Sequence, residues 1–109
     1  MKIKVALAGC FFATLALGAA AGENEQLILG KQLFTQKAVP ACAVCHTLAD
    51  AGSEGAIGPV LDELKPDEAR VAKAIRDGIG QMPSYKGRLS DDQILALAKY
   101  VAQAAAGGK

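Results

Sequence analysis

Apolar and polar residues alternate with a helical period in three separate stretches of the chain. The first covers residues 24–37, where Leu27, Ile28, Leu33 and Phe34 fall near one face of a helix. Gly30 lies among them, although a glycine inside a helix costs about 1 kcal/mol relative to alanine. We therefore expect Gly30 to permit close contact between this helix and a neighbour.

The second helical stretch covers residues 66–77. Pro66 fits the first turn, where proline lacks only an N–H that would have no partner in the helix. Asp67 and Glu68 suit the positive end of the helix dipole, and Gly78 is a typical stop. The apolar side of this helix is formed by Val71, Ala72, Ala74 and Ile75.

The third stretch shows the clearest helical pattern. Ser90 is a typical N-cap, and Gln93 three residues later completes a capping box. The apolar positions that follow with helical spacing are Ile94, Leu95, Leu97, Ala98 and Val101.

Glycine- and proline-rich loops at residues 50–60 and 78–87 connect these stretches, and no segment indicates a strand. The pattern predicts an all-α fold of three to five short helices with long loops. Loops of this length are uncommon in so small a domain unless something holds them. Beyond the N-terminal segment the aromatic residues are Phe34, Tyr85 and Tyr100, so a further group is expected to fill the core.

The first 21 residues have the layout of a secretory signal peptide, with Lys2 and Lys4, an apolar run and then small residues. We expect cleavage after Ala21, export to the periplasm and a single domain at residues 22–109. An uncleaved membrane anchor is the first alternative, but the apolar run is short for a span. Lipoprotein processing at Cys10 is the second, but the apolar run continues past that residue.

Removal of the signal changes the charge balance. Lys2 and Lys4 leave with it, so ten basic residues face eleven acidic ones. Such a balance is not that of a basic nucleic-acid binder. Met82 becomes the one methionine of the remaining chain, and Cys42 and Cys45 its two cysteines.

Residues 42–46 read Cys-Ala-Val-Cys-His, the C-x-x-C-H pattern of covalent haem attachment. One turn of backbone brings Cys42 and Cys45 to the same side, where each thiol can add to one vinyl group of a porphyrin. His46 then lies where its ring can ligate the iron. The pattern predicts one haem c, with His46 as an axial ligand.

Two other uses of these residues must be weighed. Structural zinc requires four ligands, whereas this chain has Cys42, Cys45 and His46 side by side and no second group. A thioredoxin-like dithiol also has the C-x-x-C spacing, but it belongs to a βαβ context that is absent here.

The second axial ligand is expected to be Met82, which lies in a glycine-flanked loop 36 residues after His46. Pro83 biases Met82 toward an extended conformation, which would hold the thioether outward from the loop. A methionine ligand raises the reduction potential relative to two histidines. A backbone carbonyl at Pro59 is expected to accept the free ring N–H of His46, which would fix the tautomer of the imidazole.

The segments "CAVCH", "GPVL", the "MP" loop and "DDQILALAKYV" together resemble a class I bacterial cytochrome c. The resemblance extends from Gly30 to Val101 and implies a haem-centred all-α fold and one-electron transfer. In that family the first and last helices cross near a small residue and aromatics, which Gly30, Phe34 and Tyr100 match. The stretch "HTLADAGSEGAIGPVLDELKPD" is similar to cytochrome subunits or partners of periplasmic sulfite dehydrogenases.

The expected function is therefore that of an electron carrier rather than an enzyme. A periplasmic dehydrogenase, with sulfite dehydrogenase as the candidate, would donate electrons, and a terminal oxidase or another cytochrome would accept them. No nucleic acid is expected as a partner, and no membrane span is expected after signal cleavage. The alternative is a haem protein with an open sixth site, acting as a ligand sensor or a peroxidase-like enzyme. That alternative usually needs a distal acid–base group, and the chain has no second histidine.

Overall fold

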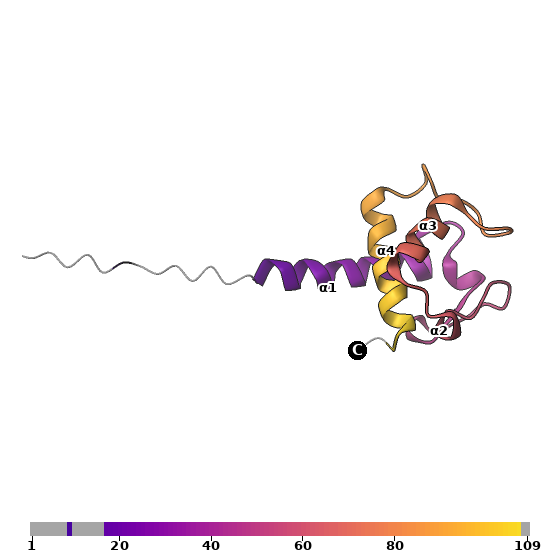
Figure 1. Ribbon diagram of the computed structural model, residues 1–109, viewed down its shortest axis with the longest axis horizontal. Helices are drawn as coiled ribbons and strands as arrows, with labels where there is room; N and C mark the ends of the chain where they lie inside the picture. The colour runs from indigo at the N-terminus through magenta and orange to yellow at the C-terminus, as the bar shows by residue number, and fades with distance from the viewer. Residues whose placement is uncertain (1–8, 10–16, 108–109) are drawn as a thin grey trace, which may run out of the picture.

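The computed structural model describes residue 9 and residues 17–107, and its body is formed by short helices joined by loops (Figure 1). Most of the predicted signal peptide, residues 1–8 and 10–16, lies outside the described residues. The α-helices are α1 (Leu17–Gln32), α2 (Leu61–Leu64), α3 (Glu68–Asp77) and α4 (Asp91–Ala105). A π-helical turn (Leu33–Lys37), two 3₁₀ turns (Cys42–Val44 and Ala49–Ala51) and the antiparallel strands β1 (Thr47–Leu48) and β2 (Ser53–Glu54) complete the fold.

The predicted all-α fold is confirmed, and all three predicted stretches are helical. The capping box at Ser90 and Gln93 is present as well. None of the helices among residues 17–107 is long and apolar enough to cross a membrane.

The structure corrects four details of the sequence analysis. Ile28 is 59% exposed, so it lies outside the buried face of the first helix. Pro66 precedes the second helix, since Asp67 is the N-cap and its carboxylate accepts the Arg70 N–H at 2.7 Å. The single-turn helix α2 was not predicted. The expectation that the chain has no strand is also wrong, because β1 and β2 pair. Each strand has two residues, which is too short for an alternating pattern to reveal.

Helix α1 crosses α4 at Gly30, and no larger residue fits there. A Cβ atom on Gly30 would lie 2.4 Å from the Ala96 carbonyl oxygen and 2.4 Å from the Tyr100 Cβ. The close approach expected for Gly30 is therefore present, and it sets the distance between the two helices.

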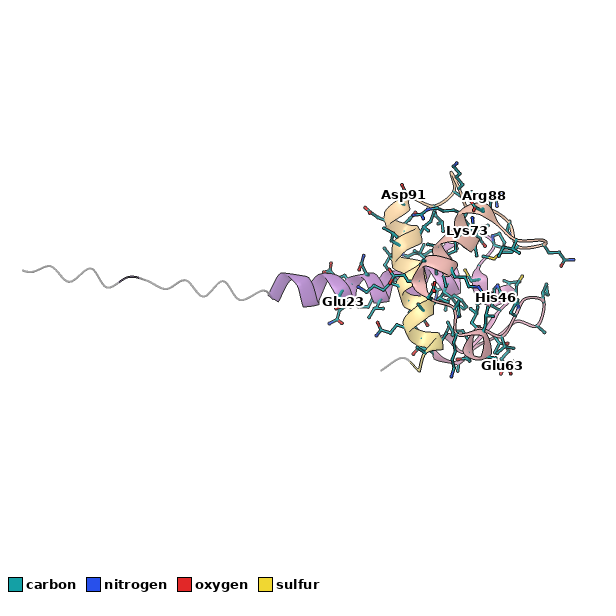
Figure 2. The ribbon with its side chains drawn as sticks, viewed as in Figure 1. Glu23, His46, Glu63, Lys73, Arg88 and Asp91 are labelled. Atoms are coloured by element: carbon teal, nitrogen blue, oxygen red, sulfur yellow. The ribbon has the colours of Figure 1, made fainter. Side chains whose placement is uncertain are left out.

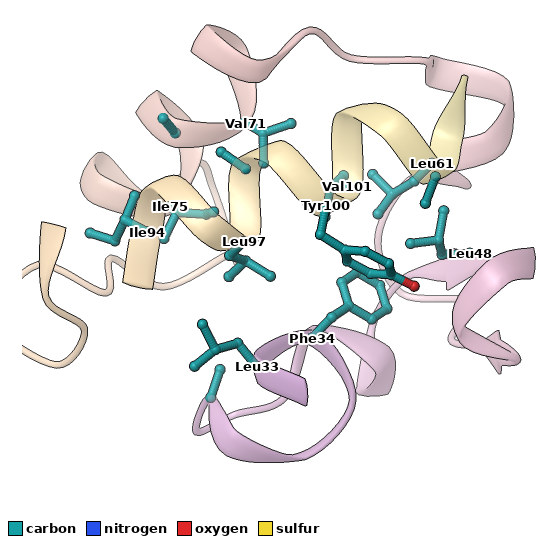
Figure 3. Packing of buried hydrophobic residues seen from close by; sticks show 14 of the residues in the cluster. Leu33, Phe34, Leu48, Leu61, Val71, Ile75, Ile94, Leu97, Tyr100 and Val101 are labelled. Carbon is teal, nitrogen blue, oxygen red and sulfur yellow. The ribbon is translucent and has the colours of Figure 1, made fainter. Parts of the chain in front are cut away.

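The core lies where this crossing meets the following turns. Phe34 packs edge-on against Tyr100, with ring centroids 6.1 Å apart and an interplanar angle of 66° (Figure 3). Around these rings the buried side chains are mostly aliphatic: Leu33, Leu48, Leu61, Val71, Ile75, Ile94, Leu97 and Val101.

Replacing Gly30 by alanine is expected to destabilise the fold. The added methyl group meets backbone atoms of α4, so the helices must separate at a cost of about 1–3 kcal/mol. Guanidinium unfolding of the two proteins measures this difference. Gln32→Ala is the control, because Gln32 lies two residues later in the same helix and is exposed to solvent. Equal stability of Gly30→Ala and the parent chain would contradict this account of the crossing.

Candidate functional site

The cysteines and the histidine are brought together by one tight turn. The 3₁₀ turn begins at Cys42, whose carbonyl oxygen accepts hydrogen bonds from the Cys45 N–H at 3.1 Å and the His46 N–H at 2.9 Å. The three residues therefore lie on a single turn of backbone. His46 lies on the side of the helical core that is opposite to the N-terminal end of α1 (Figure 2).

The His46 ring is held by the loop that follows the β-strands. Its Nδ1 donates to the Pro59 carbonyl oxygen at 2.8 Å. Gly58 lies against the ring, because a Cβ atom there would be 2.5 Å from His46 Cε1 and 2.8 Å from Nδ1. A glycine is required at this position for the ring to stay in place. With Nδ1 engaged, Nε2 is the nitrogen left to ligate a metal.

The main chain of His46 is fixed by Ser53, a buried polar residue with 8% of its surface exposed. The Ser53 hydroxyl donates to the His46 carbonyl oxygen at 2.9 Å and accepts the Leu48 N–H at 3.0 Å. Gly55 then passes close to the cysteine turn, since a Cβ atom there would lie 2.6 Å from the backbone nitrogen of His46. The β1–β2 hairpin thus returns the chain from His46 toward Gly58.

A second contact ties the hairpin to the helices. The Tyr100 hydroxyl on α4 donates to Asp50 Oδ2 at 2.6 Å, and Lys31 Nζ lies 3.5 Å from the same oxygen. The hydrogen bond from Tyr100 holds the pKa of Asp50 below its ordinary value, with the Lys31 charge adding to the effect. The carboxylate is therefore ionised at neutral pH and anchors the segment after His46 to both long helices.

Met82 lies in the loop between α3 and α4. It is partly buried and packs against the core cluster. The Met82 N–H donates to the Ile79 carbonyl oxygen at 2.8 Å, and the Ile79 N–H donates to the Met82 carbonyl oxygen at 3.1 Å. These two bonds close a tight turn that ends at Met82.

Tyr85 joins this loop to the cysteine turn. Only 3% of its surface is exposed, and its hydroxyl donates to the Pro40 carbonyl oxygen at 2.5 Å. Pro40 is two residues before Cys42. Burial raises the pKa of Tyr85 to about 12, and the nearby thiols of Cys42 and Cys45 add to the rise. The segment after Met82 therefore lies beside the haem-attachment pattern.

The Cys42 thiol does not have the low pKa of a reactive cysteine. Both Cys42 and Cys45 are free. Burial raises the pKa of the Cys42 thiol to about 11, so this group is neutral at physiological pH. A reactive dithiol instead needs a thiol whose pKa is lowered. Among residues 17–107, no group of three or more His, Cys, Asp or Glu side chains is arranged to hold a metal ion.

The residues present fit a haem group. Two thiols and an imidazole share one turn, and Gly58 leaves the imidazole the space that a Cβ would fill. Large apolar side chains that are more than half exposed adjoin each segment of the site, as expected of surface that serves a ligand or a partner. They are Val39, Val44, Ile57 and Ile79.

The helical fold and the thiol–imidazole turn define a c-type cytochrome. Residues 25–101 match the family described as cytochrome C oxidase, cbb3-type, subunit III, and the chain belongs to this family. It is a monohaem class I c-type cytochrome with one covalently bound haem c, the group of electron-carrying proteins that the sequence resembles.

Relatives and a solved structure agree with this assignment. Cytochrome c6 from Chlorolobion braunii is 38% identical over 95 residues, covering 79% of this chain and 99% of the relative. Cytochrome c6 from Tetradesmus obliquus is 32% identical over 96 residues, with the same coverage. The crystal structure of the c-type cytochrome SorU from Sinorhizobium meliloti is 49% identical, with a TM-score of 0.73 over 79% of this chain and 95% of that one.

No pattern in the sequence assigns Ser53 or Tyr85 to the site, and the "GPVL" segment does not reveal that Gly58 contacts the His46 ring. Each acts through a contact with a residue distant in sequence or with a backbone atom, and serine and glycine are common in loops of any kind. The one sequence signal near Ser53 is the glycine before it, and in the structure Gly52 adopts a φ of 62° in the turn that leads to Ser53.

Removing the Ser53 hydroxyl is expected to weaken the His46 side of the site. Ser53→Ala leaves the buried Leu48 N–H without its acceptor, which costs about 1–3 kcal/mol in unfolding free energy. Thermal or guanidinium unfolding checks this loss. The control is Thr35→Ala, which removes an exposed hydroxyl that donates to the Lys31 carbonyl. If both variants lose the same stability, the buried pair has no special role.

Proposed function

We propose that this cytochrome is an exported one-electron carrier whose haem is linked to Cys42 and Cys45 and ligated by His46 and Met82. When bound, the haem supplies a single-electron Fe(III)/Fe(II) couple. The observation that carries the proposal is the His46 ring, with Nδ1 bonded to Pro59 and one face against Gly58. That arrangement fixes the tautomer and leaves Nε2 as the ligand.

Met82 as the second ligand is supported by the position of its loop. Tyr85, three residues later, is bonded to Pro40 just before the cysteine turn. A thioether ligand favours ferrous iron and raises the reduction potential. With His46 and Met82 both held by the chain, the ligands need not move when the electron is gained or lost.

The alternative function is that of a ligand sensor or a peroxidase-like enzyme, in which the sixth position of the iron would be open. A sensor or a peroxidase-like enzyme would need a distal acid–base group, and His46 is the one histidine of the chain. We therefore place the protein among carriers rather than enzymes. Reduced protein that does not bind carbon monoxide at neutral pH supports the carrier, and rapid binding supports the open site.

The partners follow from the same proposal. The stretch of residues 46–67 is similar to cytochromes of periplasmic sulfite dehydrogenases, so we propose such an enzyme as the donor. A terminal oxidase or another cytochrome would be the acceptor. Export to the periplasm would follow from the N-terminal 21 residues, cleaved after Ala21 to leave residues 22–109 without a membrane span.

Replacing Met82 by alanine is expected to vacate one axial position. The ferric protein should lose its methionine-to-iron charge-transfer band, the potential should fall, and carbon monoxide should bind to the reduced form. Optical spectra and a redox titration measure these changes. An unchanged spectrum and potential would remove Met82 from the ligand set, while the thioether links could still be present.

The donor assignment predicts electron transfer from sulfite. Ferric protein mixed with catalytic sulfite dehydrogenase and excess sulfite should be reduced rapidly, which the growth of the ferrous α-band records. Mixtures without enzyme and mixtures without sulfite are the controls. Reduction no faster than in these controls would contradict this donor without affecting the proposed ligand set.

A further inference from the structure

The loop that carries Met82 also caps the end of α3. The final carbonyl groups of a helix have no partners within it and must find them elsewhere. Here the Ala74 carbonyl accepts the N–H of the C-cap residue Gly78 at 2.8 Å, which is the last i→i−4 bond of the helix, and the next carbonyl, that of Ile75, accepts the Tyr85 N–H at 2.8 Å. The two ends of the loop are thus bonded to adjacent carbonyls of one helix turn.

Ser84 supplies the next bond in this series. Its hydroxyl donates to the Arg76 carbonyl oxygen and accepts the Lys86 N–H at 3.2 Å. Two successive carbonyls of α3, those of Ile75 and Arg76, are therefore satisfied by the end of the loop, and the second depends on a side chain. That side chain lies two residues after Met82.

The first residue of the loop, Gly78, packs against the backbone of its last residues. Gly78 has a φ of 71°, and a Cβ atom there would lie 2.7 Å from the Met82 carbonyl oxygen and 2.9 Å from the Ser84 nitrogen. The chain therefore doubles back on Gly78, and the Met82 backbone lies between the two attachments to α3. By contrast, Ile79 at the outer part of the loop is 67% exposed.

We propose that Ser84 is a positioning residue that keeps Met82 on the iron by clamping its loop to the end of α3. This inference rests on the proposed ligation by Met82. Loss of the hydroxyl frees the Arg76 carbonyl and leaves the end of the loop attached through the Tyr85 N–H. The loop then opens more often, and with each opening Met82 leaves the sixth position accessible to external ligands.

Cyanide binding to the ferric holoprotein tests the clamp. At saturating cyanide the rate is set by the dissociation of Met82, which is followed as loss of the methionine-to-iron charge-transfer band. One exposed hydrogen bond predicts an increase of about fivefold in this rate for Ser84→Ala. Ser84→Thr keeps a hydroxyl at the same position and should return the rate to within about twofold of the parent.

Thr35→Ala is the matched control. The Thr35 hydroxyl is also exposed and also donates to a helix carbonyl, that of Lys31, but it lies in the turn after α1. Its removal should leave the cyanide rate unchanged. Amide exchange in the ferrous protein gives a second readout, since the Tyr85 N–H should exchange faster in Ser84→Ala.

The outcomes separate the clamp from the ligand assignment. A parent protein with the charge-transfer band, whose Ser84→Ala variant reacts at the parent rate, would overturn the clamp and leave Met82 as the ligand. Equal acceleration in Thr35→Ala and Ser84→Ala would also overturn it, because the effect would then be general. A parent protein without the band would overturn ligation by Met82 and the clamp together.

Discussion

The position of the His46 ring is the constraint on which the rest of the structure depends. Its Nδ1 is bonded to the Pro59 carbonyl, and the absence of a side chain at Gly58 leaves the ring the space that a Cβ would otherwise fill. The segment from residue 47 to residue 60 serves this arrangement, since the β1–β2 pair turns the chain back and Ser53 holds the His46 carbonyl from below. Without that return, the cysteine turn would present an imidazole free to rotate.

The two sides of the site are built differently. On the His46 side, the buried Ser53 holds the main chain and a glycine contacts the ring, while the bond from Nδ1 to Pro59 is exposed and Asp50 ties the segment to Tyr100 of α4. On the Met82 side, the loop is attached to the end of α3 through backbone carbonyls and one exposed serine. Exposed hydrogen bonds are the first to open, and Ser84 is exposed whereas Ser53 is buried, so movement of ligands is expected on the methionine side.

The chemistry of the site could be predicted because it needs few residues at fixed spacing: Cys42, Cys45 and His46 have one common use together. Helices were predictable where local signals agree, as with the capping box at Ser90 and the glycine at the α1–α4 crossing. The β-strands and α2 are too short to produce a periodic pattern in the sequence. The roles of Ser53 and Ser84 depend on contacts with other segments, which no local pattern indicates. Pro66 was misplaced because Asp67, rather than the proline, supplies the cap that begins α3.

The central claim is that two sulfur–carbon links and the fixed imidazole hold one porphyrin in this chain. The most direct test is a pyridine haemochrome spectrum combined with the intact mass of protein exported from a host that matures c-type cytochromes. The account predicts a spectrum of haem with both vinyl groups saturated, and a mass equal to residues 22–109 plus one haem. A colourless protein, or haem that separates from the polypeptide in acidified organic solvent, would contradict it.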